Sequence, residues 1–186
     1  MLRDLGMLIL RLTIGTLLMG HGSQKLFGWF GGYGLRGTAV WLEGLGFRPG
    51  HRWAPVVGLA EFGGGLLTAL GLVHPVGPIV TMAPMSVAIG TAHWGKPIWA
   101  TAGGGELPAT NIAIATALTL AGPGRFSLDR VLGIRLPGPI AALVAAATAI
   151  GVVVALTSRA VPSQRPEAEA GTRVEAGQEV EVLGTA

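Results

Sequence analysis

Five long apolar stretches limit this chain to one kind of fold. They cover residues 5–22, 53–73, 76–93, 107–121 and 139–157. A helix needs about 20 apolar residues to cross the hydrocarbon core of a bilayer. Soluble helices of similar length carry a charged face, but the second to fourth stretches together hold one charged residue, Glu61. The pattern predicts an all-α, polytopic membrane helical bundle.

The composition excludes several other classes of protein. Charged residues make up 12% of the chain, about half of the roughly 25% found in soluble domains. The sequence has no cysteine, which excludes disulfides, cysteine metal sites and thiol chemistry. Its Lys and Arg residues are scattered rather than clustered, so we expect no nucleic-acid partner. Residues 158–186 are polar and acidic, with three Arg and five Glu, and are predicted to be a disordered tail.

The tryptophans distinguish the two membrane faces. If the helices alternate in direction, the connections 23–52 and 94–106 share the face opposite the N-terminus. Lys and Arg divide almost evenly between the faces, so they do not set the orientation. Tryptophan favours the membrane interface, and all five fall on the opposite face: Trp29, Trp41, Trp53, Trp94 and Trp99. The apolar run GWFGGYG within 23–52 predicts that this segment is half-buried or re-entrant.

A few ionisable residues lie inside or at the ends of the apolar stretches, where charge is costly and usually functional. They are Arg11, His21, Lys25, Glu61, His93 and Glu106. A rise of about 1.5 Å per residue places five of the six in the half of the membrane near the opposite face. The same count separates Arg11 and Glu61 by about 8 Å in depth. We therefore expect a polar site near that face and an Arg11–Glu61 pair, either a structural ion pair or the floor of the site.

Each of these residues also has a purely structural interpretation. Lys25 would extend to the interface, and His21 and His93 would satisfy helix ends. Glu106 precedes an apolar stretch, where a carboxylate meets the positive end of a helix dipole. The glycines around Glu61, including Gly64 and Gly65, allow close helix packing or leave room for a flat ligand.

Four sequence segments resemble the DoxX family of small bacterial membrane proteins. They are LRLTIGTLLMGHGSQKLFGWFGGYGLRGTAVWLEGLGFRPG, AEFGGGLLTALGL, AHWGKPIWATAGGGE and LAGPGRFSLDRVLG. The resemblance covers about residues 5–135 and implies a four-helix core at 1–135, which makes 136–157 an additional C-terminal transmembrane helix. It also implies a multi-pass protein of the bacterial plasma (inner) membrane with a cytoplasmic N-terminus. The residues that match the family's polar positions are Arg11, His21, Gly22, Lys25, Glu61, His93 and Glu106.

The family's relatives include subunits of membrane redox enzymes, so the resemblance implies a quinone-linked redox subunit of an oxidoreductase complex. Its expected cofactor is a quinone, either menaquinone or ubiquinone. Side chains that donate hydrogen bonds or relay protons form the expected catalytic set: His21, Lys25, Glu61, His93 and Glu106. Gln24, Trp29 and Trp94 would contact the quinone, and Arg11, Gly64 and Gly65 would form the floor of the site. Electrons would come from a partner protein or another bound cofactor.

Other functions stay open at this point. The main alternative is a non-catalytic membrane anchor or assembly subunit of a larger complex, and a homo-oligomer is also compatible with the sequence. His21 and His93 could be axial haem ligands or, with Glu61 or Glu106, form a two-His-one-carboxylate metal site, but this alternative is disfavoured. A di-iron site of the usual kind would need four carboxylates, and only two are available. We therefore predict no metal site. A transporter is disfavoured because the sequence shows no repeated halves.

Overall fold

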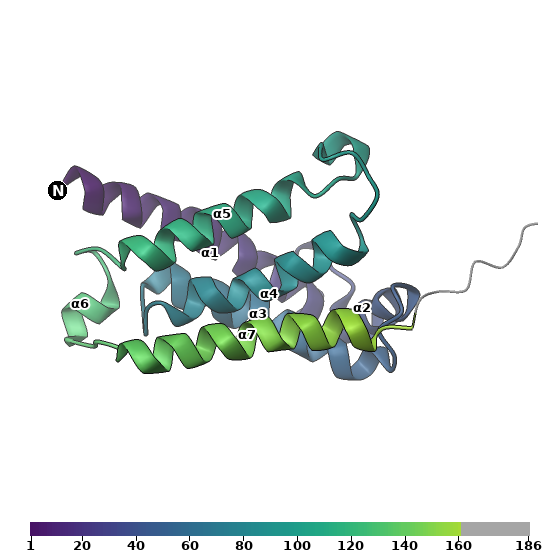
Figure 1. Cartoon of the computed structure of the whole chain (residues 1–186). Helices are drawn as coiled ribbons and strands as arrows, with labels where there is room; N and C mark the ends of the chain where they lie inside the picture. Colours follow the sequence, from purple (N-terminus) through teal and green to yellow (C-terminus); the bar gives the residue numbers. More distant parts are fainter. Residues whose placement is uncertain (161–186) are drawn as a thin grey trace, which may run out of the picture.

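The computed structural model of the protein describes residues 1–160, and this part of the chain is entirely helical (Figure 1). It contains seven α-helices and two short 3-10 turns and no β-strand. Except for its first residues, the predicted polar tail lies outside the described residues. The elements are α1 (Leu2–Phe27), η1 (Trp29–Gly31), α2 (Gly34–Gly44), α3 (Gly50–Leu70), α4 (Val76–Thr91), η2 (Ala100–Ala102), α5 (Glu106–Ala121), α6 (Leu128–Leu132) and α7 (Gly138–Ser158).

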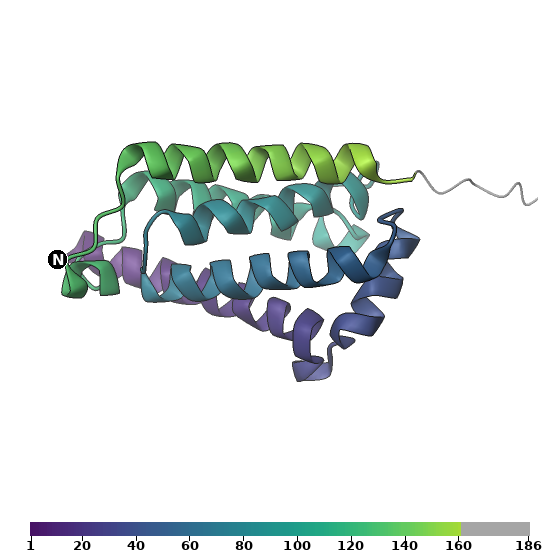
Figure 2. The same cartoon turned by 90° about the horizontal axis from the view of Figure 1, so that it is seen from below.

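The long helices pack side by side as a bundle. Helix α3 contacts both α1 and α4, and α4 contacts α5 and α7. Figure 2 shows α7, α4, α3 and α1 following one another across the bundle, with the short α2 crossing one end. The all-α membrane bundle predicted from the sequence is confirmed by this arrangement.

The number of membrane crossings is less definite than the sequence suggested. Helices α1, α3 and α7 are long and apolar enough to cross a bilayer. Helices α4 and α5 have 16 residues each, which corresponds to about 24 Å at 1.5 Å per residue. That is shorter than a hydrocarbon core of about 30 Å. The structure therefore supports a multi-pass helical membrane protein with three helices of full spanning length among the described residues.

Glycine and proline mark the helix ends and so decide where the connections lie. Helix α1 stops at Gly28 and α3 at Gly71, both with positive φ, which glycine adopts at no steric cost. Helix α7 starts directly after Pro137. The connections collect at two faces of the bundle (Figure 1). The N-terminal face carries the start of α1, residues 71–75 and residues 122–137, and the opposite face carries residues 28–49 and 92–105.

The bundle has a small apolar interior and an apolar exterior. Met7, Ile14, Leu18, Met85 and Leu118 form a buried cluster. Many large apolar side chains point outward instead, and in α7 Ala155 is the one buried residue. In a bilayer such side chains contact lipid tails, so close packing rather than hydrophobic exclusion joins the helices.

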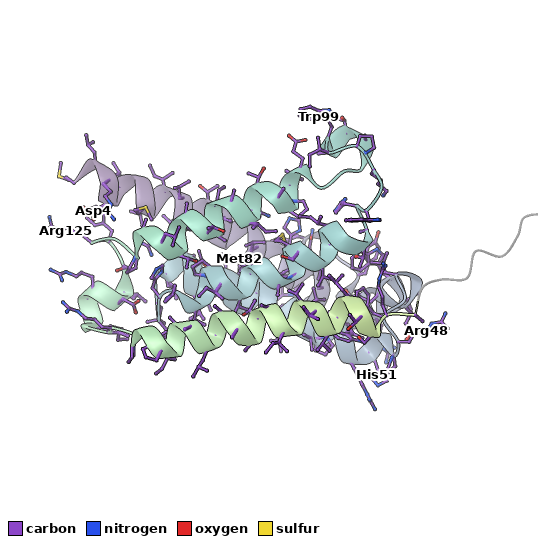
Figure 3. The ribbon with its side chains drawn as sticks, in the orientation of Figure 1. Asp4, Arg48, His51, Met82, Trp99 and Arg125 are labelled. Carbon is purple, nitrogen blue, oxygen red and sulfur yellow. The ribbon has the colours of Figure 1, made fainter. Side chains whose placement is uncertain are left out.

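The segment 23–52 is half-buried, as the sequence predicted. Its helix α2 packs on α3 and buries Thr38 and Leu42, while Phe30 and Tyr33 are exposed. All five tryptophans lie at or near the opposite face, as expected. Figure 3 shows Trp99 and His51 at this end of the bundle and Asp4 and Arg125 at the other.

Candidate functional site

An ion pair between α1 and α3 is the centre of the candidate site. Lys25 Nζ lies 2.5 Å from Glu61 Oε2. Glu61 is 4% exposed, whereas the side chain of Lys25 is 21% exposed. The carboxylate is thus inside the helix interface, and the ammonium connects it to the molecular surface.

The predicted Arg11–Glu61 pair is wrong. Arg11 is 1% exposed, but its guanidinium donates to two backbone carbonyls, from Nη2 to Phe126 O at 2.6 Å and from Nη1 to Ala69 O at 3.3 Å. These carbonyls belong to the N-terminal face. Arg11 therefore ties α1 to the end of α3 and to the 122–127 connection, away from the Lys25–Glu61 pair.

A cavity of about 230 Å³ lies beside Lys25 at the opposite face. It is open to the surface and is lined by the end of α1 and by the segment that runs through η1 into α2. Its lining combines polar side chains, glycine backbone and two aromatic rings: Gln24, Lys25, Gly31, Gly32, Tyr33, Thr38 and Trp41. We call this the Lys25 cavity. It offers hydrogen-bond donors from Lys25, Gln24 and Tyr33 next to flat aromatic surface.

Two predicted site residues of α1 belong to this neighbourhood. The amide of Gln24 donates from Nε2 to Phe30 O at 3.2 Å, which holds the segment after α1 against that helix. Gln24 Oε1 lies 3.2 Å from Nδ1 of His21. His21 is exposed and does not line the cavity.

The structure places His93 and Glu106 in a separate group. His93 Nδ1 lies 2.7 Å from Gly103 O, and Glu106 Oε2 accepts the backbone N–H of Ala100 at 2.8 Å. Both side chains thereby brace the connection between α4 and α5. A second cavity there is lined by His93 and Trp94 among others, and it shares no lining residue with the Lys25 cavity.

Of the remaining predicted contacts, Trp29 and the two glycines have other neighbours. Trp29 is largely exposed and contacts Phe27, with ring centroids 4.8 Å apart. The ring that lines the Lys25 cavity is Trp41. A Cβ atom on Gly64 would lie 2.7 Å from Thr81 Cγ2, and one on Gly65 would lie 2.6 Å from Met19 N. Gly64 and Gly65 therefore serve close helix packing, the first of the two uses that the sequence allowed.

Within residues 1–160, no three His, Cys, Asp or Glu side chains come together in a way that could hold a metal ion. His21 lies on α1 and His93 in the α4–α5 connection.

Sequence reasoning missed five residues that line the Lys25 cavity: Gly31, Gly32, Tyr33, Thr38 and Trp41. Tyr33 is the one tyrosine in the chain, and it lies within the GWFGGYG run that indicated a half-buried segment. Its position in that run was an available signal. Thr38 and Trp41 depend on the formation of α2, which the sequence did not reveal.

The fold and the site together define a class of protein. It is a multi-pass helical membrane protein in which a buried ion pair borders a small amphipathic cavity near one face. Residues 6–94 match the model of the DoxX family, which supports assignment of the chain to that family. The match covers α1 to α4, including the ion pair and the whole Lys25 cavity. No curated protein and no solved structure matches the chain.

Proposed function

We propose that this protein is a quinone-binding subunit of a membrane oxidoreductase complex, with the quinone headgroup in the Lys25 cavity. The observation that carries the proposal is the Lys25–Glu61 pair, whose lysine lines that cavity. As the DoxX resemblance implies, we place the protein in the bacterial plasma membrane with its N-terminus in the cytoplasm.

The size and lining of the cavity suit one flat ring. Sites for drug-sized ligands usually measure about 300–1,000 Å³, so a cavity of about 230 Å³ accommodates a headgroup and excludes a dinucleotide. Tyr33 and Trp41 supply aromatic surface. Lys25 and Gln24 supply donors for the two carbonyl oxygens of a quinone. The apolar tail of the quinone would remain in the lipid.

The ion pair offers a proton path. A quinone takes up two electrons and two protons to become a quinol. Lys25 Nζ would hold a proton at the cavity wall, and Glu61 would accept protons that enter from the aqueous side past the exposed His21. The chain has no cysteine to bind an iron–sulfur cluster or attach a haem. Electrons would therefore come from a partner subunit that carries a flavin, haem or iron–sulfur centre.

One set of contacts favours the second candidate, a non-catalytic membrane anchor or assembly subunit. His93 and Glu106 make local bonds to Gly103 and Ala100, as expected if they only fix the α4–α5 connection. Under this alternative the Lys25–Glu61 pair would serve only to position α1 against α3.

Binding of a short-chain quinone separates the two candidates. Wild-type protein in nanodiscs is titrated with decylubiquinone and with a short-chain menaquinone analogue by calorimetry. We expect one bound molecule per protein and at least about tenfold weaker binding by Lys25→Met/Glu61→Gln, which removes both charges together and so leaves neither stranded. Lys96→Met, an exposed lysine of the α4–α5 connection, is the matched control and should bind like the wild type. Absence of binding by the wild type, or unchanged binding by the double variant, would rule out the quinone site.

A further inference from the structure

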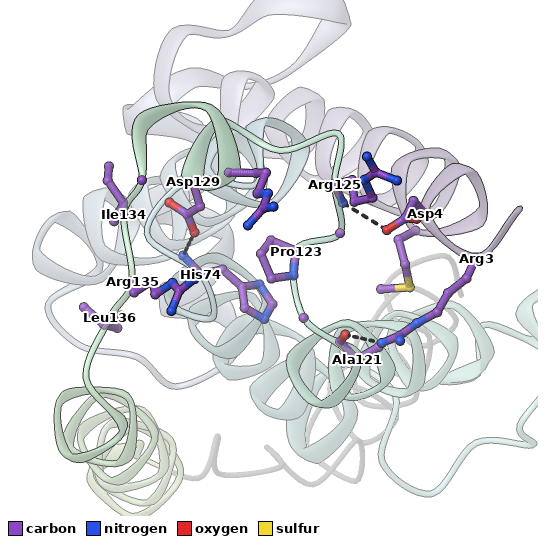
Figure 4. Close-up of a pocket in the computed structure, with 15 residues that line it drawn as sticks. Arg3, Asp4, His74, Ala121, Pro123, Arg125, Asp129, Ile134, Arg135 and Leu136 are labelled. Carbon is purple, nitrogen blue, oxygen red and sulfur yellow. Dashed lines mark hydrogen bonds between the residues drawn. The ribbon is translucent and has the colours of Figure 1, made fainter. Parts of the chain in front are cut away.

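The N-terminal face carries a further pocket, of about 530 Å³, which is larger than the Lys25 cavity. It lies between the start of α1, the α3–α4 turn and residues 121–136 (Figure 4). Four arginines line it: Arg3, Arg125, Arg130 and Arg135. In the sequence these four arginines are scattered over 133 positions, but the fold brings them together around one opening. We call it the arginine pocket.

The two acidic residues of the arginine pocket are occupied by backbone groups. The carboxylate of Asp129 accepts the N–H groups of Val73 and His74, each at 2.7 Å. Asp4 accepts the N–H of Arg125 at 3.1 Å. With four arginines and two carboxylates, the charged side chains around the pocket sum to +2.

Three of the guanidinium groups have no partner in the described part of the chain. Arg3 Nη2 donates to Ala121 O at 2.8 Å. The side chains of Arg125, Arg130 and Arg135 make neither a hydrogen bond nor an ion pair with any residue of 1–160. All three are exposed. Each guanidinium presents five N–H donors in a planar fork, so the pocket has a surplus of positive charge and of unused donors.

The backbone that carries these arginines is held in place by hydrogen bonds from buried side chains. The buried guanidinium of Arg11 donates to Phe126 O, and Asp129 fixes the α3–α4 turn. Figure 4 shows Arg3 and Arg125 on one side of Pro123 and His74 with Arg135 on the other. The arginines therefore approach one space from two sides on a braced backbone.

We propose that the arginine pocket binds a phosphate group at the membrane surface. Arginine forks match the oxygens of phosphate and bind them in a bidentate manner. Basic pockets between transmembrane helices at a membrane face suit anionic lipid headgroups. The volume exceeds that of a bare phosphate and lies within the about 300–1,000 Å³ typical of ligand sites. The phosphate could thus belong to an anionic phospholipid or to a soluble phosphate compound.

Two probes distinguish these sources. Protein in mild detergent is examined by native mass spectrometry with dioleoylphosphatidylglycerol and with dioleoylphosphatidylcholine, whose phosphate is balanced by choline. Thermal unfolding with added sodium phosphate, against sodium chloride of equal ionic strength, tests the soluble source. Preference for phosphatidylglycerol identifies a lipid headgroup, and stabilisation by phosphate without lipid preference identifies a soluble ligand. Either result supports the proposed phosphate site. If the wild type shows neither effect, the proposal is overturned.

Matched variants locate the effect in the arginine pocket. Arg130→Gln/Arg135→Gln should weaken the wild-type effect about tenfold or more, because two charge-assisted contacts are lost. Arg48→Gln/Arg52→Gln removes two exposed arginines from the opposite face and should leave binding unchanged. If the first double variant does not fold, the single variant Arg135→Gln is measured in the same way. Wild-type binding by the variants at the arginine pocket, or an equal loss in the control, would place the ligand elsewhere.

Discussion

The Glu61 carboxylate on α3 forms an ion pair with the ammonium of Lys25 on α1, at 2.5 Å. Lys25 is the one hydrogen-bond or ion-pair partner of this carboxylate within residues 1–160. The two partners are unequally buried, because Glu61 is almost fully enclosed whereas Lys25 reaches the Lys25 cavity. Glu61 therefore depends on Lys25 for its charge balance more than Lys25 depends on Glu61.

Because the two partners are unequally buried, Lys25→Met and Glu61→Gln should lower the stability of the folded protein by different amounts. Lys25→Met strands a buried carboxylate and should cost about 3–5 kcal/mol of stability, as for other broken buried pairs. Adding Glu61→Gln removes the stranded charge and should restore most of the loss. The measurement is the unfolding midpoint in mild detergent for wild type, both single variants and the double variant. Additive losses would show that the two side chains are energetically independent.

A close approach of α1 and α3 leads to a second prediction. Gly15 on α1 and Gly65 on α3 face each other, and a Cβ on either would lie 2.7 Å from the carbonyl oxygen of the other. Gly65→Ala should therefore push the helices apart and cost about 1–3 kcal/mol, as overpacking does in other cores.

Gly63 is the matched control for that substitution. It lies on the same helix, but a Cβ there would meet nothing within 4 Å. Gly63→Ala should be neutral or stabilising by up to about 1 kcal/mol, because alanine is the better helix former. Equal unfolding midpoints for the two alanine variants would refute the proposed role of Gly65 in packing.

The long helices could be predicted closely from the sequence. Helix α4 covers Val76–Thr91 against an expected 76–93, and α5 covers Glu106–Ala121 against 107–121. Where an apolar run ends at Gly or Pro, the local sequence indicates where the helix begins and ends. Helix α2 lacks such a signal, since it begins at a glycine inside a glycine-rich segment. Packing of Thr38 and Leu42 stabilises it.

The sites were harder to predict, because depth along a helix does not identify a neighbour. Counting residues placed Lys25 and Glu61 in the same half of the membrane, but it also suggested Arg11 as the partner of Glu61. The observed partners of Arg11 are carbonyls of Ala69 and Phe126, 58 and 115 positions away. Every residue has a carbonyl, so no residue type marks such a partner. The arginine pocket escaped prediction for a related reason, since only the fold brings its four arginines together.

A third prediction concerns His74, in the turn between α3 and α4 beside the arginine pocket. Burial lowers the pKa of His74 below its ordinary value of 6.5, with Arg11 acting in the same direction, while the Thr119 backbone and the Asp129 carboxylate oppose the shift. The folded state thus favours the neutral imidazole more than the unfolded chain does. His74 therefore contributes stability above about pH 6.5, and this contribution is lost as the pH falls toward the lowered pKa.

We expect the unfolding midpoint of the wild type to drop between about pH 7.5 and pH 5.5, and the drop to be smaller in His74→Gln, which cannot take up the proton. His51→Gln is the control, because His51 is exposed at the opposite face (Figure 3) and its replacement should preserve the wild-type drop. The measurement is thermal unfolding in detergent at constant ionic strength without phosphate, so that ligand binding in the arginine pocket does not contribute. If His74→Gln shows the same drop as the wild type, the acid sensitivity arises from other groups, and protonation of His74 does not oppose folding.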